Sequence, residues 1–163
     1  MPLPFDPIDE AHRNWRSNDW GAADPMAAAT SITRAHQVLL HRIDAALAPF
    51  DLNFSRFEAL ALLHFSRHGS LPLGKVGDRL QVHPTSVTNT IDRLEADGLV
   101  RRTPHPTDRR TTLAEITRRG RTTVEQAAGA LADIRFGLDG MGRDDLSAVT
   151  AALTGLRQGA GDF

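Results

Sequence analysis

The sequence predicts a mainly α-helical fold that contains one small β-hairpin, and three observations support this prediction. Of the 163 residues, 40% are hydrophobic but only 6% are aromatic, so helix-forming Ala and Leu supply much of the apolar content. Apolar residues recur at helical spacing in several separate stretches. Two β-prone runs, in contrast, flank the turn residues Pro106, Thr107 and Asp108. A chain of this length corresponds to one domain that can bury a core.

Composition also excludes several classes of protein. The absence of cysteine excludes a disulfide framework, a thiolate metal site and a thiol redox switch. No apolar run approaches the roughly 18 to 20 residues that span a bilayer, and the start MPLPFDPIDE lacks the basic and apolar parts of a signal peptide. We therefore expect a soluble, cytoplasmic protein.

The first two helices are predicted from their apolar faces. Residues 1–24 should form an extension with one short amphipathic helix. The residues that share its apolar face are Ile8, Ala11 and Trp15. A long helix should follow over residues 25–50, with Asp24 as its N-cap and Pro25 at its first position. Its apolar stripe consists of Ile32, Ala35, Leu39, Ile43 and Leu47.

The next helix should begin at Ser55. The S-R-F-E spacing from Ser55 to Glu58 is that of a capping box, in which the serine and glutamate side chains each bond a free amide of the first turn. This helix should continue towards Gly69.

Two shorter helices follow, separated by a break near residues 81–84. Their apolar positions are Leu73, Val76 and Leu80 in the first, and Val87, Ile91 and Leu94 in the second. The second should open near His83 and close at Asp97 and Gly98, where glycine can take the left-handed conformation. Two helices joined by such a tight turn form a helix-turn-helix unit.

The outward face of the second short helix is polar and nearly uncharged. Its residues are Thr85, Ser86, Thr88, Asn89 and Asp92. Short polar side chains of this kind can enter a major groove and form hydrogen bonds with base edges. The alternative is an ordinary solvated helix surface.

The hairpin that follows is strongly basic. Residues 99–121 contain seven arginines and two acids, although the net charge of the whole chain is −1. The arginines at the bend are Arg101, Arg102, Arg109 and Arg110. A local basic patch is sufficient to attract phosphate, because the field at the contact surface matters more than the net charge. The alternative is again a solvated, charged hairpin.

The C-terminal part should form two further helices. Thr117 can cap a long helix, and Gly140 and Gly142 interrupt the pattern before the last one. The apolar positions are Val124, Ala128, Leu131 and Leu138 in the long helix, and Leu146, Val149, Leu153 and Leu156 in the last.

Neither a catalytic site nor a metal site is indicated. The sequence contains no G-x-S-x-G elbow, no phosphate-binding loop and no G-x-G-x-x-G motif, so we expect no enzyme activity. His64 and His68 are four residues apart, and His36 and His41 are five apart, but no cysteine or carboxylate joins either pair at a recognised ligand spacing. We therefore expect no metal and no cofactor.

The order of helix, helix, helix-turn-helix, basic hairpin, helix and helix resembles the MarR family of winged helix-turn-helix transcription regulators. The resemblance covers roughly residues 25–158. Its most specific part is HPTSVTNTIDRLEADGLVRR followed by HPTDRRTTLAEITRRG, which contains the D-x-R signature from Asp108 to Arg110.

This resemblance implies a division of labour within one domain. Residues 55–117 would form the winged helix-turn-helix lobe that binds DNA, and residues 25–50 and 118–160 would form the helices of a homodimer interface. The protein would then be a sequence-specific DNA-binding regulator, in the usual case a ligand-responsive repressor on a pseudo-palindromic operator. The alternative from the residues alone is a winged-helix module that binds an acidic protein partner.

The resemblance also assigns roles at the DNA interface. Arg110 would enter the minor groove, Asp108 would hold its guanidinium fork in place, and Arg109 would contact phosphate. The predicted DNA-contacting residues are Pro84, Thr85, Ser86, Thr88, Asn89, Arg93, Arg102, Asp108, Arg109 and Arg110, and additional contacts to the DNA backbone are expected from Arg101, Arg118 and Arg119. For Arg93 an ion pair with Asp97 at i+4 is the alternative.

An effector site is implied by a narrower likeness. The extra N-terminal helix that carries tryptophan is similar to one found in the urate-responsive subgroup of the family. By this likeness, Trp15, Glu58 and Arg102 stand at the positions that line the ligand pocket in that subgroup. Thr90 stands where that subgroup has an arginine, and glutamate replaces aspartate at residue 58, which weakens the case for an anionic purine. Another small aromatic or phenolic effector is the alternative. Each residue also has a simpler explanation. Trp15 can serve in packing, Glu58 as the acid of the capping box, and Arg102 as a phosphate contact.

Overall fold

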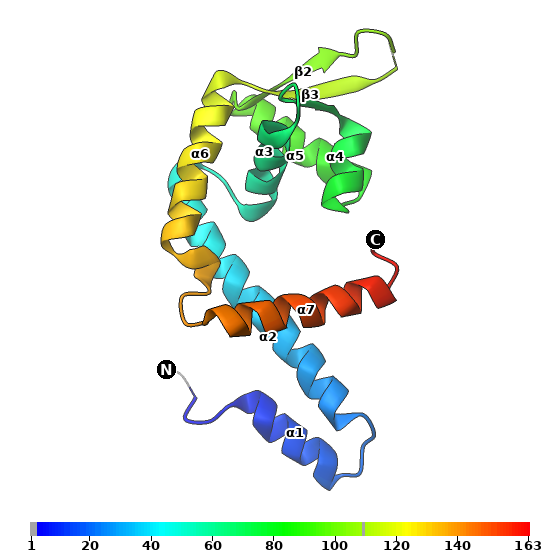
Figure 1. Cartoon of the computed structure of the whole chain (residues 1–163), viewed down its shortest axis with the longest axis vertical. Helices are drawn as coiled ribbons and strands as arrows, with labels where there is room; N and C mark the ends of the chain where they lie inside the picture. The colour runs from blue at the N-terminus through cyan, green and yellow to red at the C-terminus, as the bar shows by residue number, and fades with distance from the viewer. Residues whose placement is uncertain (1–2, 109) are drawn as a thin grey trace.

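The computed structural model describes residues 3–108 and 110–163. It is elongated, with a lobe that carries the β-sheet at one end and helical arms that extend to the other (Figure 1). The elements in chain order are α1 (Pro7–Ser17), α2 (Ala23–Leu47), the 3-10 turn η1 (Ala48–Phe50), α3 (Phe54–Phe65), β1 (Ser70–Pro72), α4 (Leu73–Leu80), α5 (Pro84–Ala96), β2 (Val100–Pro104), β3 (Thr112–Ile116), α6 (Arg118–Asp133), the 3-10 turn η2 (Arg135–Gly137) and α7 (Arg143–Gly159). The predicted mainly α-helical fold class with a small β wing is confirmed. In the part of the chain that the structure describes, no helix has the length and apolar character needed to cross a membrane.

The sheet has three antiparallel strands in the order β1-β3-β2. Strands β2 and β3 form the predicted hairpin, with Val100 opposite Ile116 and Pro104 opposite Thr112. Strand β1 was not predicted from the sequence. It pairs only three residues with β3, from Ser70 to Pro72, which is too short for an alternating apolar pattern to be visible.

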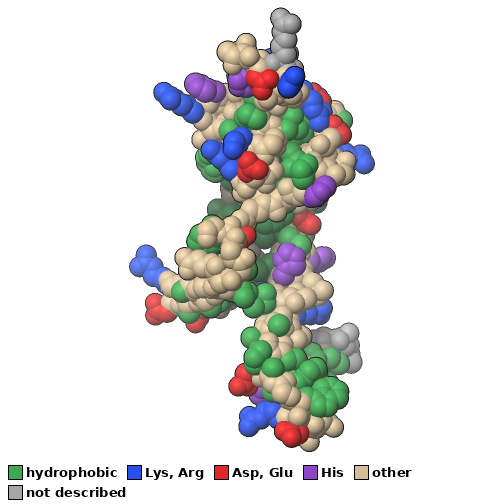
Figure 2. Space-filling view, turned by 90° about the vertical axis from the view of Figure 1, so that its right-hand side faces the viewer, with side chains coloured by type: hydrophobic (Ala, Val, Ile, Leu, Met, Phe, Trp, Pro, Cys, Tyr) green, Lys and Arg blue, Asp and Glu red, His purple; other side chains and the backbone are tan. Residues whose placement is uncertain are grey.

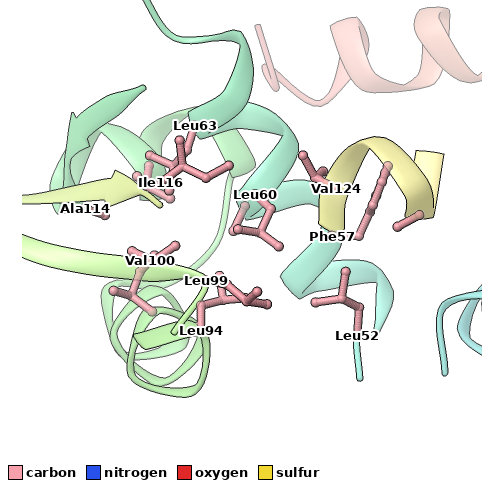
Figure 3. Packing of buried hydrophobic residues seen from close by; sticks show 14 of the residues in the cluster. Leu52, Phe57, Leu60, Leu63, Leu94, Leu99, Val100, Ala114, Ile116 and Val124 are labelled. Carbon is pink, nitrogen blue, oxygen red and sulfur yellow. The ribbon is translucent and has the colours of Figure 1, made fainter. Parts of the chain in front are cut away.

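The hydrophobic core lies entirely within the lobe and the helix ends that enter it. Every buried hydrophobic residue in the described chain falls between Ile43 and Leu131. Figure 3 shows Leu60 and Leu63 of α3 at the centre of this core, close to side chains from the sheet and from the end of α5. The lobe is therefore a packed unit that can hold the helix-turn-helix and the hairpin in a fixed arrangement.

Helix α6 starts in close contact with the end of α5. Thr117 caps it as predicted, because the Thr117 hydroxyl oxygen accepts from the Gly120 amide at 3.0 Å. A Cβ on Gly120 would lie 2.1 Å from the Leu99 carbonyl oxygen, so no larger residue fits there without a shift of the backbone. Gly98 has φ +69°, which confirms the left-handed end predicted for the second short helix.

Two predicted helix starts are wrong. Helix α2 begins at Ala23, so Asp24 lies in its first turn instead of capping it, and its carboxylate is 2.7 Å from His12 Nε2. Helix α3 is capped by Asn53, whose side-chain oxygen accepts from the Arg56 amide at 3.0 Å, and not by a box at Ser55. Asparagine caps at least as well as serine, so the earlier of two possible caps is used here.

The predicted pattern after the hairpin also needs correction. Helix α6 ends at Asp133, and Leu138 therefore lies beyond it. Its buried alanine is Ala127, whereas Ala128 is exposed. The chain turns through three consecutive left-handed residues, Arg135 to Gly137, before it enters α7. A turn of this kind leaves little mark on apolar spacing, which explains why the sequence pattern did not show it.

We call α1, α7 and residues 23–37 of α2 the arms. Neither α1 nor α7 buries a residue completely, and α2 buries only Ile43 and Leu47 near its far end. The predicted α2 stripe is consequently uncovered at its start, where Ile32 is 43% exposed. In Figure 1, α1 and the start of α2 lie at the lower end of the molecule, and α7 lies nearer the middle, with the C-terminus below α4.

Candidate nucleic-acid interface

Helix α5 presents one apolar face and one polar face, as predicted. Val87, Ile91 and Leu94 are buried in the core. The opposite side carries Thr85, Ser86, Thr88 and Asn89, all of which are exposed. Pro84 occupies the first helical position after the cap residue His83, whose Nδ1 accepts from the Thr85 amide at 3.3 Å.

The polar side chains on this face are largely available for a partner. The Thr88 hydroxyl donates to the Pro84 carbonyl at 3.1 Å, so this side chain is held against its own helix. Within the described residues, Ser86 and Asn89 make no side-chain hydrogen bond to the protein. An exposed amide can offer a donor and an acceptor side by side, which is the pattern that adenine presents in reverse in the major groove.

One open hollow borders α5, and a second lies between α4 and the hairpin. The hollow of about 440 Å³ between the start of α3 and α5 is lined by Asn53, Ser55, Arg56, Ser86, Asn89, Thr90 and Arg93. The hollow of about 590 Å³ between α4 and the hairpin is lined by Pro72, Leu73, Gly74, Lys75, Asp78, His105, Arg110, Thr111 and Thr112. Each contains arginine, and the second also contains lysine and histidine. On the face shown in Figure 2, most of the Lys, Arg and His side chains likewise gather over the lobe.

The tip of the hairpin is held together by Asp108 and His105. The Asp108 carboxylate accepts from the Arg110 amide at 3.0 Å and from the Thr111 hydroxyl at 2.6 Å. The Thr111 hydroxyl and the Arg110 amide together hold the pKa of Asp108 below its usual value. His105 Nδ1 accepts from the amides of Thr107 and Asp108 at 3.3 and 3.2 Å.

This geometry corrects one predicted contact at the tip. Asp108 bonds the backbone amide of Arg110 and not its guanidinium fork. Arg110 is one of the residues that line the hollow between α4 and the hairpin. The prediction for Arg109 lies outside the residues that the structure describes. The hydrogen bonds of His105 were not predicted, although H-P-T-D is a sequence in which a side chain bonds the backbone of its own turn.

The predicted alternative for Arg93 is wrong. Asp97 lies 3.4 Å from Arg56 instead, which connects the start of α3 with the end of α5. Arg93 is exposed and lines the same hollow as Asn89. This position is compatible with the predicted contact to a phosphate.

Arg102 makes ion pairs with two carboxylates of α5. Its guanidinium lies 2.5 Å from Glu95 Oε2 and 2.6 Å from Asp92 Oδ1, and its amide donates to Glu95 Oε1 at 2.9 Å. That amide and the guanidinium hold the pKa of Glu95 below its usual value. Asp92, predicted on the outward face of the helix, is exposed but directed to this pair.

The three residues predicted to line an effector pocket do not come together within one chain. Trp15 lies on α1, at the opposite end of the molecule from the sheet (Figure 1), where its Nε1 donates to the Gly21 carbonyl at 3.0 Å. Glu58 lines a hollow of about 50 Å³ enclosed by α3, α4 and α5, and burial raises its pKa. Arg102 lies on β2 and bonds α5.

The described residues do not form a metal site either. No group of three or more potential His, Asp or Glu ligands occurs among residues 3–108 and 110–163. His64 lies 3.9 Å from Glu125, a single carboxylate that connects α3 with α6.

Comparison with known proteins agrees with the geometry. The MarR family model matches residues 52–112, which hold the helix-turn-helix and most of the hairpin. A MarR family transcriptional regulator from Streptomyces coelicolor, known from a crystal structure, is 50% identical with a TM-score of 0.80, over 86% of this chain and 97% of that one. The regulator MOSR of M. tuberculosis, solved in complex with DNA, is 25% identical with a TM-score of 0.70, over 83% of this chain and 96% of that one.

A curated relative gives a shorter match. The HTH-type transcriptional regulator MhqR of Bacillus subtilis is 34% identical over 89 residues, which are 55% of this chain. The match spans 60% of the length of that relative. These relatives are transcription regulators and not enzymes.

Proposed function

This chain belongs to the MarR family of winged helix-turn-helix transcription regulators, and on that premise we propose that it acts as a homodimeric repressor. It binds a pseudo-palindromic operator through α5 and the hairpin, and a small effector releases it. The proposed location of the protein is the cytoplasm.

One observation carries this proposal: the uncharged polar face of α5 lies in the same lobe as two open hollows that contain arginine. A recognition helix that enters the major groove has one phosphate backbone on each side. Arg93 lies in the hollow beside α5, and Lys75 and Arg110 lie in the hollow between α4 and the hairpin. Phosphate contacts from these side chains would fix the register, so that Ser86 and Asn89 could read bases.

The exposed arms support the homodimer. A single recognition helix contacts only a short stretch of DNA, and two-fold dimers are the usual solution. Large apolar side chains remain exposed on both α2 and α7, including Ile32, Val38, Val149 and Leu156. A second copy of the chain would cover them.

The effector is proposed as a small aromatic or phenolic molecule, and no cofactor is proposed. The hollow beneath α5 supports this idea, because a ligand that enlarges it would displace the recognition helix. Its lining combines apolar side chains such as Val76 and Leu80 with the carboxyl of Glu58. Titration of candidate phenols into the complex of the protein with its operator would test whether they release the DNA.

The decisive experiment for DNA binding is fluorescence anisotropy. The purified protein is titrated onto the duplex upstream of its own coding region and onto a scrambled duplex, at near-physiological salt. We expect tight, sequence-dependent binding of two protomers per site, which weakens steeply as salt rises. Equal and weak binding to both duplexes, and to duplexes selected from a randomised library, would contradict the proposal and favour an acidic protein partner for the basic hairpin.

A further inference from the structure

Arg102 connects the hairpin to the recognition helix at three points. Its guanidinium bonds Asp92 and Glu95, and its amide bonds the second oxygen of Glu95. We call these three residues the Arg102 bridge. Because Asp92 and Glu95 are three residues apart, they lie on the same side of α5 and can both reach β2.

The charges of the Arg102 bridge argue against a phosphate contact. Two carboxylates surround one guanidinium, so the cluster carries a net negative charge close to α5. The Arg102 side chain is only 26% exposed, whereas that of the neighbouring Arg101 is 64% exposed and pairs with Glu115. A phosphate that approached Arg102 would meet Asp92, which is 55% exposed. Repulsion between like charges would oppose that contact.

The position of the Arg102 bridge suggests a different role. Between α5 and β2 the chain passes through Gly98 in a left-handed conformation, a joint that carries no side chain of its own. The Arg102 bridge spans this joint and connects residues on both sides of it. The pair of Arg56 and Asp97 fixes the same end of α5 to α3.

We infer that Arg102 is a positioning residue that holds the hairpin at a fixed angle to α5, so that Asn89 and Arg110 reach the two grooves of one operator together. This inference rests on the proposed DNA-binding function. Operator binding needs both contacts at once, and a hairpin that tilts would lose one of them. Binding to arbitrary DNA depends mainly on phosphate attraction, which tolerates a tilt.

The test compares variants that break the Arg102 bridge from either side. Glu95→Gln and Arg102→Gln are measured by anisotropy on the duplex that the wild-type protein enriches from a randomised library, and on a scrambled duplex of equal length. We expect each variant to bind the enriched duplex roughly tenfold more weakly, while affinity for the scrambled duplex stays within about twofold. The double variant should be no weaker than either single one, and Arg102→Lys should recover part of the loss. Arg16→Gln, which removes one positive charge from arm helix α1, is the control.

A phosphate contact would give a different result. Arg102→Gln would then weaken binding to both duplexes equally and lower the salt slope by about one per protomer. Glu95→Gln would strengthen both, because it would free the arginine. Either outcome overturns the inference.

Hydrogen exchange separates failure of this inference from failure of the proposed function. If the wild-type protein enriches no duplex, the proposed DNA-binding function fails. The Arg102 bridge is then judged by amide exchange, without DNA, in the Glu95→Gln variant. Faster exchange in residues 84–98 with unchanged exchange in α6 would support a positioning role, and unchanged exchange in both would overturn it.

Discussion

The lobe and the arms carry apolar stripes of the same helical spacing, yet they bury them in different ways. In the lobe, Leu60, Leu63 and Leu94 are completely buried by neighbouring elements of the same chain. On the arms, Val149 and Leu156 of α7 are 45% and 59% exposed. The difference teaches that an apolar stripe identifies the inner face of a helix but not the molecule that covers it. The lobe is completed by its own chain, whereas in the proposed homodimer a second chain would cover the arms.

The largest expected effect is on stability, in the lobe. Leu60→Ala should lower the free energy of unfolding by about 2–5 kcal/mol, because it removes contacts from a site with no exposed surface. Chemical denaturation monitored by circular dichroism measures this loss. The same truncation at Leu156 should leave the unfolding of the lobe nearly unchanged. Equal losses at both positions would remove the distinction between the two regions.

The next effect is on assembly, in the arms. The double substitution Val149→Asp and Leu156→Asp should weaken dimerisation by roughly 100-fold, because two carboxylates would have to be buried in an apolar interface. Sedimentation velocity over a range of concentrations measures this change. Ser147→Asp, on another side of the same helix, is the control. A dimer that survives the double substitution would show that α7 does not form the interface.

The third prediction separates DNA binding from assembly. Arg110→Ala should weaken operator binding by roughly tenfold to 100-fold, because its guanidinium would no longer reach the minor groove. Helix content and dimerisation should stay intact. Arg16→Ala, the same change on arm helix α1, should leave affinity unchanged. Unaltered affinity of the Arg110 variant at matched salt would contradict the assignment of the wing tip.

Glycine offers the same substitution in both regions with opposite expected signs. Nothing lies within 4 Å of a Cβ built on Gly155 in α7, so Gly155→Ala should stabilise the protein by about 0.4–1 kcal/mol. Gly120→Ala should destabilise it, because the new Cβ would clash with the Leu99 carbonyl. Thermal unfolding of both variants at equal concentration provides the comparison. A loss of stability in the Gly155 variant would mean that a partner helix packs directly against that residue.

The smallest effect concerns pH and the partly buried Glu58 carboxyl in the lobe. Burial raises the pKa of Glu58 above its ordinary value of 4.5, so its charged form is disfavoured in the folded state. The stability associated with neutral Glu58 is present below that ordinary value and is lost as pH rises through the raised pKa. Glu58→Gln should therefore raise the melting temperature at pH 7 and change it little at pH 4. An equal change at both pH values would rule out this cause.

Much of the fold could be predicted because it depends on local patterns. The spacing of Val87, Ile91 and Leu94 is sufficient to orient α5, and Thr117 is sufficient to start α6. The helix starts at Ala23 and Phe54 could not be predicted as easily, since Asn53 and Ser55 are both good caps and the choice depends on the surrounding packing.

The elements that form the candidate site were predicted, but the ion pairs between their side chains were not. Sequence spacing identified the polar face of α5 and the basic hairpin. It did not show that Arg102 bonds Asp92 and Glu95, or that Asp97 bonds Arg56, because both pairs depend on how separate elements approach each other. Residues far apart in sequence, such as Trp15 and Glu58, were grouped by resemblance alone, and in a single chain they lie apart.

The hydrogen bonds of His105 determine where its ring carries a proton. Because Nδ1 accepts from two backbone amides, the neutral ring must be the tautomer with hydrogen on Nε2. The wing tip thus combines an Nε2–H donor of His105 with the cationic guanidinium of Arg110 in one hollow.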